Sequence, residues 1–122
     1  MYCKLFLDTD MGRNELGKLV TEFIQGEKDR WMIHSAVMEI FVNDNDFFDN
    51  ARKEDSQEGF LYFPYFLDIE PRTEMEGVYI ETIATLITRL WSYHIKAVAA
   101  CDFEDLLPGK GGIAFLSERA LG

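Results

Sequence analysis

The stretch from Phe60 to Glu70, FLYFPYFLDIE, constrains the fold of this chain more than any other segment. Successive side chains of a β-strand point to opposite sides of a sheet, so this stretch would have two different faces. One face is wholly apolar or aromatic: Leu61, Phe63, Tyr65, Leu67 and Ile69. The other is aromatic at one end and acidic at the other: Phe60, Tyr62, Pro64, Phe66, Asp68 and Glu70. We predict a strand with its first face in the core, and a bulge or unpaired edge at Pro64, which lacks an N–H.

Three other segments have the alternating pattern of strands: Tyr2–Thr9, Trp31–Asn43 and Lys96–Phe103. Two segments have the apolar stripe of a helix. The first stripe consists of Leu16, Leu19, Val20, Phe23 and Ile24, with Asn14 as N-cap and Gly26 as the stop. The second helix is predicted from about Val78 to His94, after a capping box formed by Thr73 and Glu76. Residues 44–59 form the longest predicted loop, and loops of this length often carry function.

The predicted element order is β-α-β-β-α-β. Right-handed crossovers and one hairpin then give a ferredoxin-like sandwich: a four-stranded antiparallel sheet in the order 4-1-3-2, with both helices on one face. In this α+β fold the odd-numbered residues of Tyr2–Thr9 and Phe60–Glu70 face the helices. The even-numbered residues of Trp31–Asn43 do so as well, which places His34 in the core. We predict a single domain over residues 1–122, in which residues 113–122 are a C-terminal extension.

The composition is that of a globular chain, with 48% hydrophobic and 14% aromatic residues, and it carries a net charge of −10. This charge argues against binding to nucleic acid or to an anionic membrane, because phosphates are contacted by Lys and Arg. The sequence shows neither a signal-peptide pattern nor an apolar run of about 18 residues, so we expect a cytoplasmic protein. Cys3 and Cys101 are expected to be free thiols that are neighbours across the first and fourth strands.

The sheet face without helices is predicted to carry many aromatic and acidic side chains. An exposed apolar patch of this kind usually marks an interface. Alternatively, the segment from Ile113 onward covers this face. The candidate partner-binding residues are Tyr2, Phe6, Glu39, Phe41, Phe60, Tyr62, Phe66, Asp68 and Glu70.

The sequence offers little evidence of catalytic chemistry. A group of carboxylates, Asp68, Glu70, Asp102, Glu104 and Asp105, is expected at one edge of the sheet. Such a group could hold a divalent ion, but we favour a solvated acidic rim. The segment after Asp44 lacks the glycine and glutamate of an EF-hand, and the LPGKGG segment lacks the spacing of a phosphate-binding loop. We predict no catalytic residues, no metal site and no cofactor.

Two resemblances bear on function. The segments ACDFEDLLPGKGG (residues 100–112) and FLYFPYFLDIEP (residues 60–71) resemble a family of small uncharacterised bacterial proteins, which implies no particular activity. In size, acidity and layout the chain is also similar to immunity proteins of bacterial polymorphic-toxin and contact-dependent inhibition systems. That resemblance implies a toxin inhibitor without chemistry of its own, whose acidic, aromatic surface blocks a basic toxin domain.

We therefore expect a non-enzymatic protein-binding module with a protein partner, and an immunity protein is the form that the resemblance implies. Two alternatives remain open from the sequence. One is a small enzyme, or a metal-binding or ligand-binding domain, with its site at the carboxylate edge. The other is a homodimer that forms through the open face of the sheet.

Overall fold

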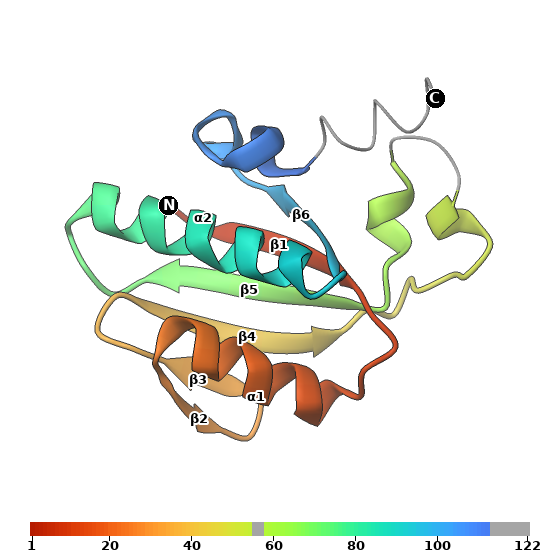
Figure 1. Cartoon of the computed structure of the whole chain (residues 1–122), viewed down its shortest axis with the longest axis horizontal. Coiled ribbons are helices and arrows are strands. Elements are labelled where there is room, and N and C mark those ends of the chain that lie inside the picture. The colour runs from red at the N-terminus through yellow and green to blue at the C-terminus, as the bar shows by residue number, and fades with distance from the viewer. Residues whose placement is uncertain (55–57, 113–122) are drawn as a thin grey trace.

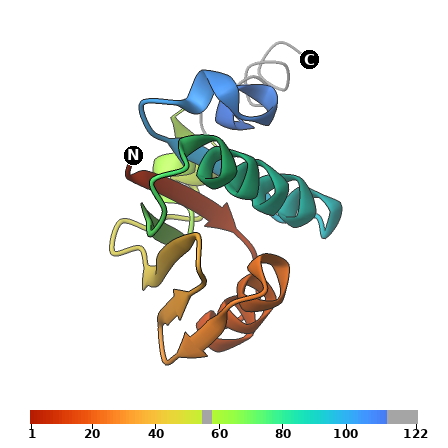
Figure 2. The ribbon, with the colours of Figure 1, turned by 90° about the vertical axis from the view of Figure 1, so that its left-hand side faces the viewer.

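The computed structural model describes residues 1–54 and 58–112, which form a six-stranded antiparallel sheet and two α-helices (Figure 1). The strands are β1 (Cys3–Asp8), β2 (Glu27–Asp29), β3 (Met32–His34), β4 (Met38–Asp44), β5 (Tyr65–Pro71) and β6 (Lys96–Ala100). Their order in the sheet is β2-β3-β4-β5-β1-β6. The helices α1 (Arg13–Ile24) and α2 (Glu76–Ser92) lie on the same side of the sheet, as the two views in Figures 1 and 2 show.

The prediction of a four-stranded, ferredoxin-like sheet is wrong, because the predicted strand Trp31–Asn43 is two strands and Glu27–Asp29 is a third. Ser35 causes the division. Its N–H donates to the Met38 carbonyl at 2.9 Å, and its Oγ accepts hydrogen bonds from the N–H groups of Val37 and Met38. These bonds close a tight turn between β3 and β4, so the chain reverses where a continuous strand was expected.

The same turn corrects the predicted orientation of His34. Residues of β3 and β4 pair so that Ile33 is opposite Ile40 and His34 is opposite Glu39. Ile33 is therefore the buried residue of β3, and His34 is half-buried on the face away from the helices. The alternation of buried and exposed side chains cannot be continued through this two-residue turn. Odd-numbered residues of β3 pair with even-numbered residues of β4, and paired residues lie on the same face of the sheet.

The main core lies between the sheet and the helices. It contains the odd-numbered residues of β1 and β5 and the even-numbered residues of β4, as the alternation predicts. From α2 it receives Tyr79, which is fully buried and whose hydroxyl donates to the Ile69 carbonyl at 3.1 Å. The Tyr79 ring also packs edge-on against Phe103, with the ring centroids 5.9 Å apart.

The helix ends differ by a few residues from the predicted ones. Helix α1 is capped by Gly12 instead of Asn14, and it ends before Gln25, which has the left-handed backbone conformation (φ 53°). Helix α2 begins two residues before Val78. Thr73 Oγ1 accepts a hydrogen bond from Met75 N, the N-cap residue, instead of bonding to Glu76.

We expect the protein to lose stability as the pH rises above about 10, the ordinary pKa of tyrosine. Burial raises the pKa of Tyr79, and it also raises the pKa values of Tyr2 and Tyr65. Above pH 10 the unfolded chain releases these protons while the folded chain retains them, so the free energy of unfolding falls as the pH rises. Urea unfolding at a series of alkaline pH values tests this. The free energy of unfolding should fall less steeply with pH in Tyr79→Phe than in the wild type. A stability that does not change across this range would contradict it.

We call residues 45–54 and 58–64 the covering segment, because Phe60 and Phe63 of this segment pack on the sheet face opposite the helices. Phe63 of this segment forms a second buried cluster with Phe6 of β1 and Val98 of β6. The predicted strand Phe60–Glu70 accordingly begins only at Tyr65, after Pro64, and Gly59–Tyr62 is a short 3-10 helix. Phe63 thus contributes to the opposite side of the sheet from the one predicted, and Leu61 is exposed instead of buried.

Residues 108–112 lie along the outer edge of β6. The backbones of Gly111 and Gly112 have φ values of 77° and 100°, and a Cβ on Gly112 would lie only 2.5 Å from the Ala97 carbonyl oxygen, whereas one on Gly111 would lie 3.1 Å from that of Ala99. Glycine is the residue that accepts both conditions. This glycine-rich segment covers a strand edge that would otherwise present unpaired backbone groups.

Two predictions concern residues beyond the described ones. The predicted C-terminal extension (113–122) lies outside the described residues. The alternative that this segment covers the open sheet face therefore stays a prediction. The single-domain assignment stays a prediction. Within residues 1–54 and 58–112, no helix has the length and apolarity needed to cross a membrane.

Candidate protein-binding face

Two cross-strand rows of side chains lie on the part of the sheet away from the helices and beside the covering segment. The first row joins Glu27, His34, Glu39 and Glu70, and Tyr2 precedes the Cys3–Ile69 pair at its end. The second row joins Asp29, Met32, Phe41, Asp68 and Lys4. We call these ten residues the acidic face.

Two aromatic side chains of the acidic face are open to solvent. Tyr2 is 46% exposed and Phe41 is 38% exposed. The Tyr2 hydroxyl donates a hydrogen bond to one carboxylate oxygen of Asp68, and Asn43 Nδ2 donates to the other at 3.0 Å. Burial, together with this bond and the negative charges nearby, raises the pKa of Tyr2, so the phenol stays protonated and keeps its bond to Asp68. The network fixes a tyrosine and a carboxylate at the end of the face that β5 and β1 form.

The charge of the acidic face is strongly negative. It has five carboxylates, on Glu27, Asp29, Glu39, Asp68 and Glu70, whereas its basic side chains are Lys4 and His34. Lys4 is directed onto aromatic rings, because its Nζ lies 4.2 Å from the ring centroid of Phe66 and 5.2 Å from that of Phe6. Glu39 and Glu70 are direct cross-strand partners of like charge, an arrangement that destabilises a sheet unless a cation compensates.

The structure separates the predicted partner-binding residues into two groups. Tyr2, Glu39, Phe41, Asp68 and Glu70 lie together on the acidic face. The other four, Phe6, Phe60, Tyr62 and Phe66, lie at or under the covering segment.

Phe6 is only 5% exposed, so its predicted place on an open surface is wrong. The ring of Phe60 packs edge-on against it, with the centroids 5.3 Å apart. Tyr62 is half-buried, and the guanidinium of Arg52 lies 5.3 Å from the centroid of its ring. The reason for the correction is that aromatic residues of the covering segment pack onto the aromatic residues of the strands.

Sequence reasoning missed two sets of surface residues, of which the first is exposed and the second half-buried. Phe47, which is 76% exposed, and Phe48, which is 45% exposed, lie on the covering segment beside the acidic residues Asp44 and Asp46. A pair of phenylalanines within an acidic loop was the available signal. Met32 and His34 were missed because the turn at Ser35 reverses the orientation of β3.

The predicted carboxylate edge has no metal-binding geometry within the described ranges. There, no group of three or more His, Cys, Asp or Glu side chains is arranged to hold a metal ion. Asp68 is engaged with Tyr2 and Asn43, and Glu104 Oε2 accepts a hydrogen bond from Cys101 N at 3.4 Å. Asp68 and Glu104 are thus engaged by different neighbours.

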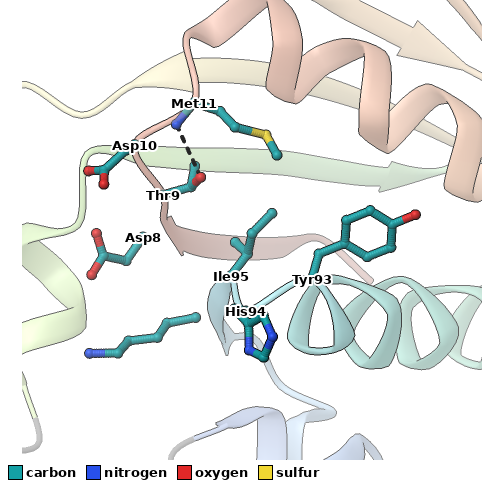
Figure 3. A pocket seen from close by; sticks show the side chains of 8 residues that line it. Asp8, Thr9, Asp10, Met11, Tyr93, His94 and Ile95 are labelled. Atoms are coloured by element: carbon teal, nitrogen blue, oxygen red, sulfur yellow. Dashed lines mark hydrogen bonds between the residues drawn. The ribbon is translucent and has the colours of Figure 1, made fainter.

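A pocket of about 350 Å³ lies at the other end of β1 from the carboxylate edge. It is lined by residues 8–11, from the last residue of β1 into the turn, and by residues 93–96, from the end of α2 to the first residue of β6. Figure 3 shows the carboxylates of Asp8 and Asp10 on one side of the pocket, the Tyr93 ring on the other and His94 below. Asp8 is also paired with Lys53 at 3.0 Å. This ion pair already engages one of the two carboxylates that line the pocket.

In the part of the chain that the structure describes, fold and surface define a small α+β protein with two helices on one side of a six-stranded antiparallel sheet and a negatively charged, partly aromatic face on the other. No protein-family model, no curated protein and no solved structure matches the chain.

Proposed function

We propose that this protein is a non-enzymatic binding module that recognises a basic protein surface through the acidic face. The observation that carries the proposal is the composition of that face: five carboxylates lie on the same face as the exposed rings of Tyr2 and Phe41. Exposed aromatic side chains supply binding energy when they are buried in an interface, and surrounding charges direct the encounter.

Charge complementarity favours a basic partner over a second copy of this chain. Two copies that met through the acidic face would bring ten carboxylates together, and like charges across an interface cost several kcal/mol. A net charge of −10 also raises the rate of encounter with a cationic surface at low ionic strength. The Tyr2–Asp68–Asn43 network supports tight binding, because groups that are already held in place lose little entropy on association.

The more specific form of the proposal is an immunity protein that blocks a basic toxin domain. Its support is the acidic, aromatic surface together with the resemblance in size and acidity. If a toxin gene lies beside the gene of this protein, co-expression with the toxin domain that it encodes tests this form. We expect growth to be restored by the wild-type protein and not by a variant of the acidic face. If the variant restored growth as well as the wild-type protein does, the result would contradict the use of this face.

We expect the double substitution Glu39→Lys/Glu70→Lys to weaken partner binding at least tenfold, because it replaces two carboxylates at the centre of the face with cations. The matched control is Glu22→Lys/Glu81→Lys, which makes the same change of charge at exposed positions on α1 and α2. All three proteins are immobilised and exposed to lysate of the source organism at low and high salt.

The expected result is one basic protein that is retained by the wild type and by the helix control, and lost by the face variant and at high salt. Its affinity is then measured by calorimetry with Phe41→Ala, for which we expect a loss of about 2 kcal/mol if the ring is a central contact. Equal retention by the face variant, or the absence of any basic protein at low salt, would overturn the proposal.

A further inference from the structure

Cys3 and Cys101 are brought face to face at one end of the β1–β6 pair. The register pairs Lys4 with Ala100, and one further step along both chains places Cys3 opposite Cys101. Both belong with the main core: Cys3 is part of it and Cys101 packs against it, so the two side chains lie on the helix side of the sheet. Opposite residues on antiparallel strands have Cα atoms about 4.5–5.5 Å apart, which is within the range that a disulfide spans.

The two thiols are free and lie close enough for each to perturb the pKa of the other. They differ in their surroundings, because Cys3 is fully buried whereas Cys101 is half-buried and reachable from solvent. Burial raises the pKa of both thiols, and a hydrogen bond between them raises that of Cys3 and lowers that of Cys101. Cys101 is thus the thiol that ionises first, and Cys3 is the thiol beside it.

We propose that Cys3 and Cys101 are a reversible redox pair that closes to an intramolecular disulfide when the protein meets a small-molecule disulfide such as oxidised glutathione. The inference is independent of the proposed binding role. It rests on the cross-strand juxtaposition and on the different exposure of the two sulfur atoms.

The exchange has two steps. The Cys101 thiolate attacks one sulfur of the small disulfide, so the sulfur–sulfur bond of the oxidant breaks, a mixed disulfide forms on Cys101 and one small thiolate leaves. Cys3 then gives up its proton and attacks Cys101 Sγ, so the protein disulfide forms and the second small thiolate leaves. Two electrons pass from the cysteines to the oxidant, and the two cysteine protons end on the two small thiols.

Closure would join the start of β1 to the segment that follows β6. This segment contains Phe103, which packs on Tyr79 in the main core. The disulfide would enclose almost all the described residues in one loop, and a long closed loop restricts the unfolded chain strongly. We therefore expect the oxidised form to have a higher melting temperature than the reduced form.

The test uses the full chain, reduced and then incubated with oxidised glutathione under native conditions. Intact mass, thiol titration and melting temperature are followed with time. We expect both thiols to disappear, the mass to fall by two hydrogen atoms, the melting temperature to rise, and a reducing agent to reverse all three changes. Cys3→Ser should stop at the mixed disulfide on Cys101, and Cys101→Ser should remain reduced because Cys3 is buried.

Three outcomes would overturn the proposal. One is a wild-type protein that keeps both thiols in excess oxidant. Another is a wild-type protein that stops at the mixed disulfide, as Cys3→Ser does. The third is closure that proceeds only after the chain has been unfolded in urea, because the folded structure would then not bring the two sulfur atoms together.

Discussion

Phe63→Ala is expected to lower the free energy of unfolding by about 3–5 kcal/mol, the usual cost of truncating a buried phenylalanine. Phe63 is 2% exposed, and it joins the covering segment to Phe6 and Val98 of the sheet. Truncation would leave a cavity beneath a segment that relies on this contact. The expected result is a lower urea midpoint, measured by circular dichroism.

Leu61→Ala is the matched control for this substitution. Leu61 lies two residues earlier in the same segment and is exposed, so its truncation should change stability by no more than about 0.5 kcal/mol. Equal effects of the two substitutions would contradict the described packing of residues 59–64. The alternation in the sequence predicts that both side chains lie on the same core face. The comparison therefore also distinguishes a strand over these residues from the packing seen in the structure.

Asn45→Ala is expected to lower the free energy of unfolding by about 2–4 kcal/mol. Asn45 is a buried polar residue whose Nδ2 donates to the carbonyls of Phe63 at 2.7 Å and Leu61 at 3.0 Å. Its Oδ1 accepts a hydrogen bond from Phe47 N at 3.0 Å. Alanine would remove all three bonds, and a buried group left without a partner costs about 1–3 kcal/mol.

Asn50→Ala is the control for Asn45→Ala, because Asn50 is an exposed asparagine of the same segment and should tolerate truncation within about 0.5 kcal/mol. Because Asn45 bonds to the backbone of Phe63, the double variant Asn45→Ala/Phe63→Ala should lose less stability than the sum of the two single variants. Additive losses would show that the two residues stabilise separate parts of the structure. Denaturation in urea gives the free energy of unfolding of the two single variants, the double variant and the Asn50→Ala control.

These two residues also determine the shape of the surface beside the acidic face. Asn45 ties the turn that carries Phe47 and Phe48 to the returning chain at Leu61 and Phe63. A loss of this tie would therefore change the presentation of two exposed aromatic side chains as well as stability. In the proposed function, the partner would contact Phe47 and Phe48 as well as the sheet. The Asn45 side-chain amide holds these two residues in place.

The sequence by itself determined many of the side chains that face the helices from the regular elements. Leu5 of β1, Leu67 of β5 and Ile40 of β4 follow the period of two, and Tyr79, Ile83 and Leu90 of α2 follow the helical period. The contact between Cys3 and Cys101 was also predicted from the sequence, because it depends only on the pairing of the first and last strands. Of the acidic face, Tyr2, Glu39, Phe41, Asp68 and Glu70 were predicted for the same reason.

Only the tertiary structure decided the number of strands and which aromatic residues are covered. The turn at Ser35 divides one predicted strand and places Ile33 in the core instead of His34, although both positions suit a strand. Phe63 fits the predicted alternation, yet it packs on the opposite side of the sheet, because the chain before Tyr65 folds over Phe6. Periodicity records the orientation of neighbouring side chains within one element. It contains no information on which distant segment packs against a face, since that depends on contacts between residues far apart in the sequence.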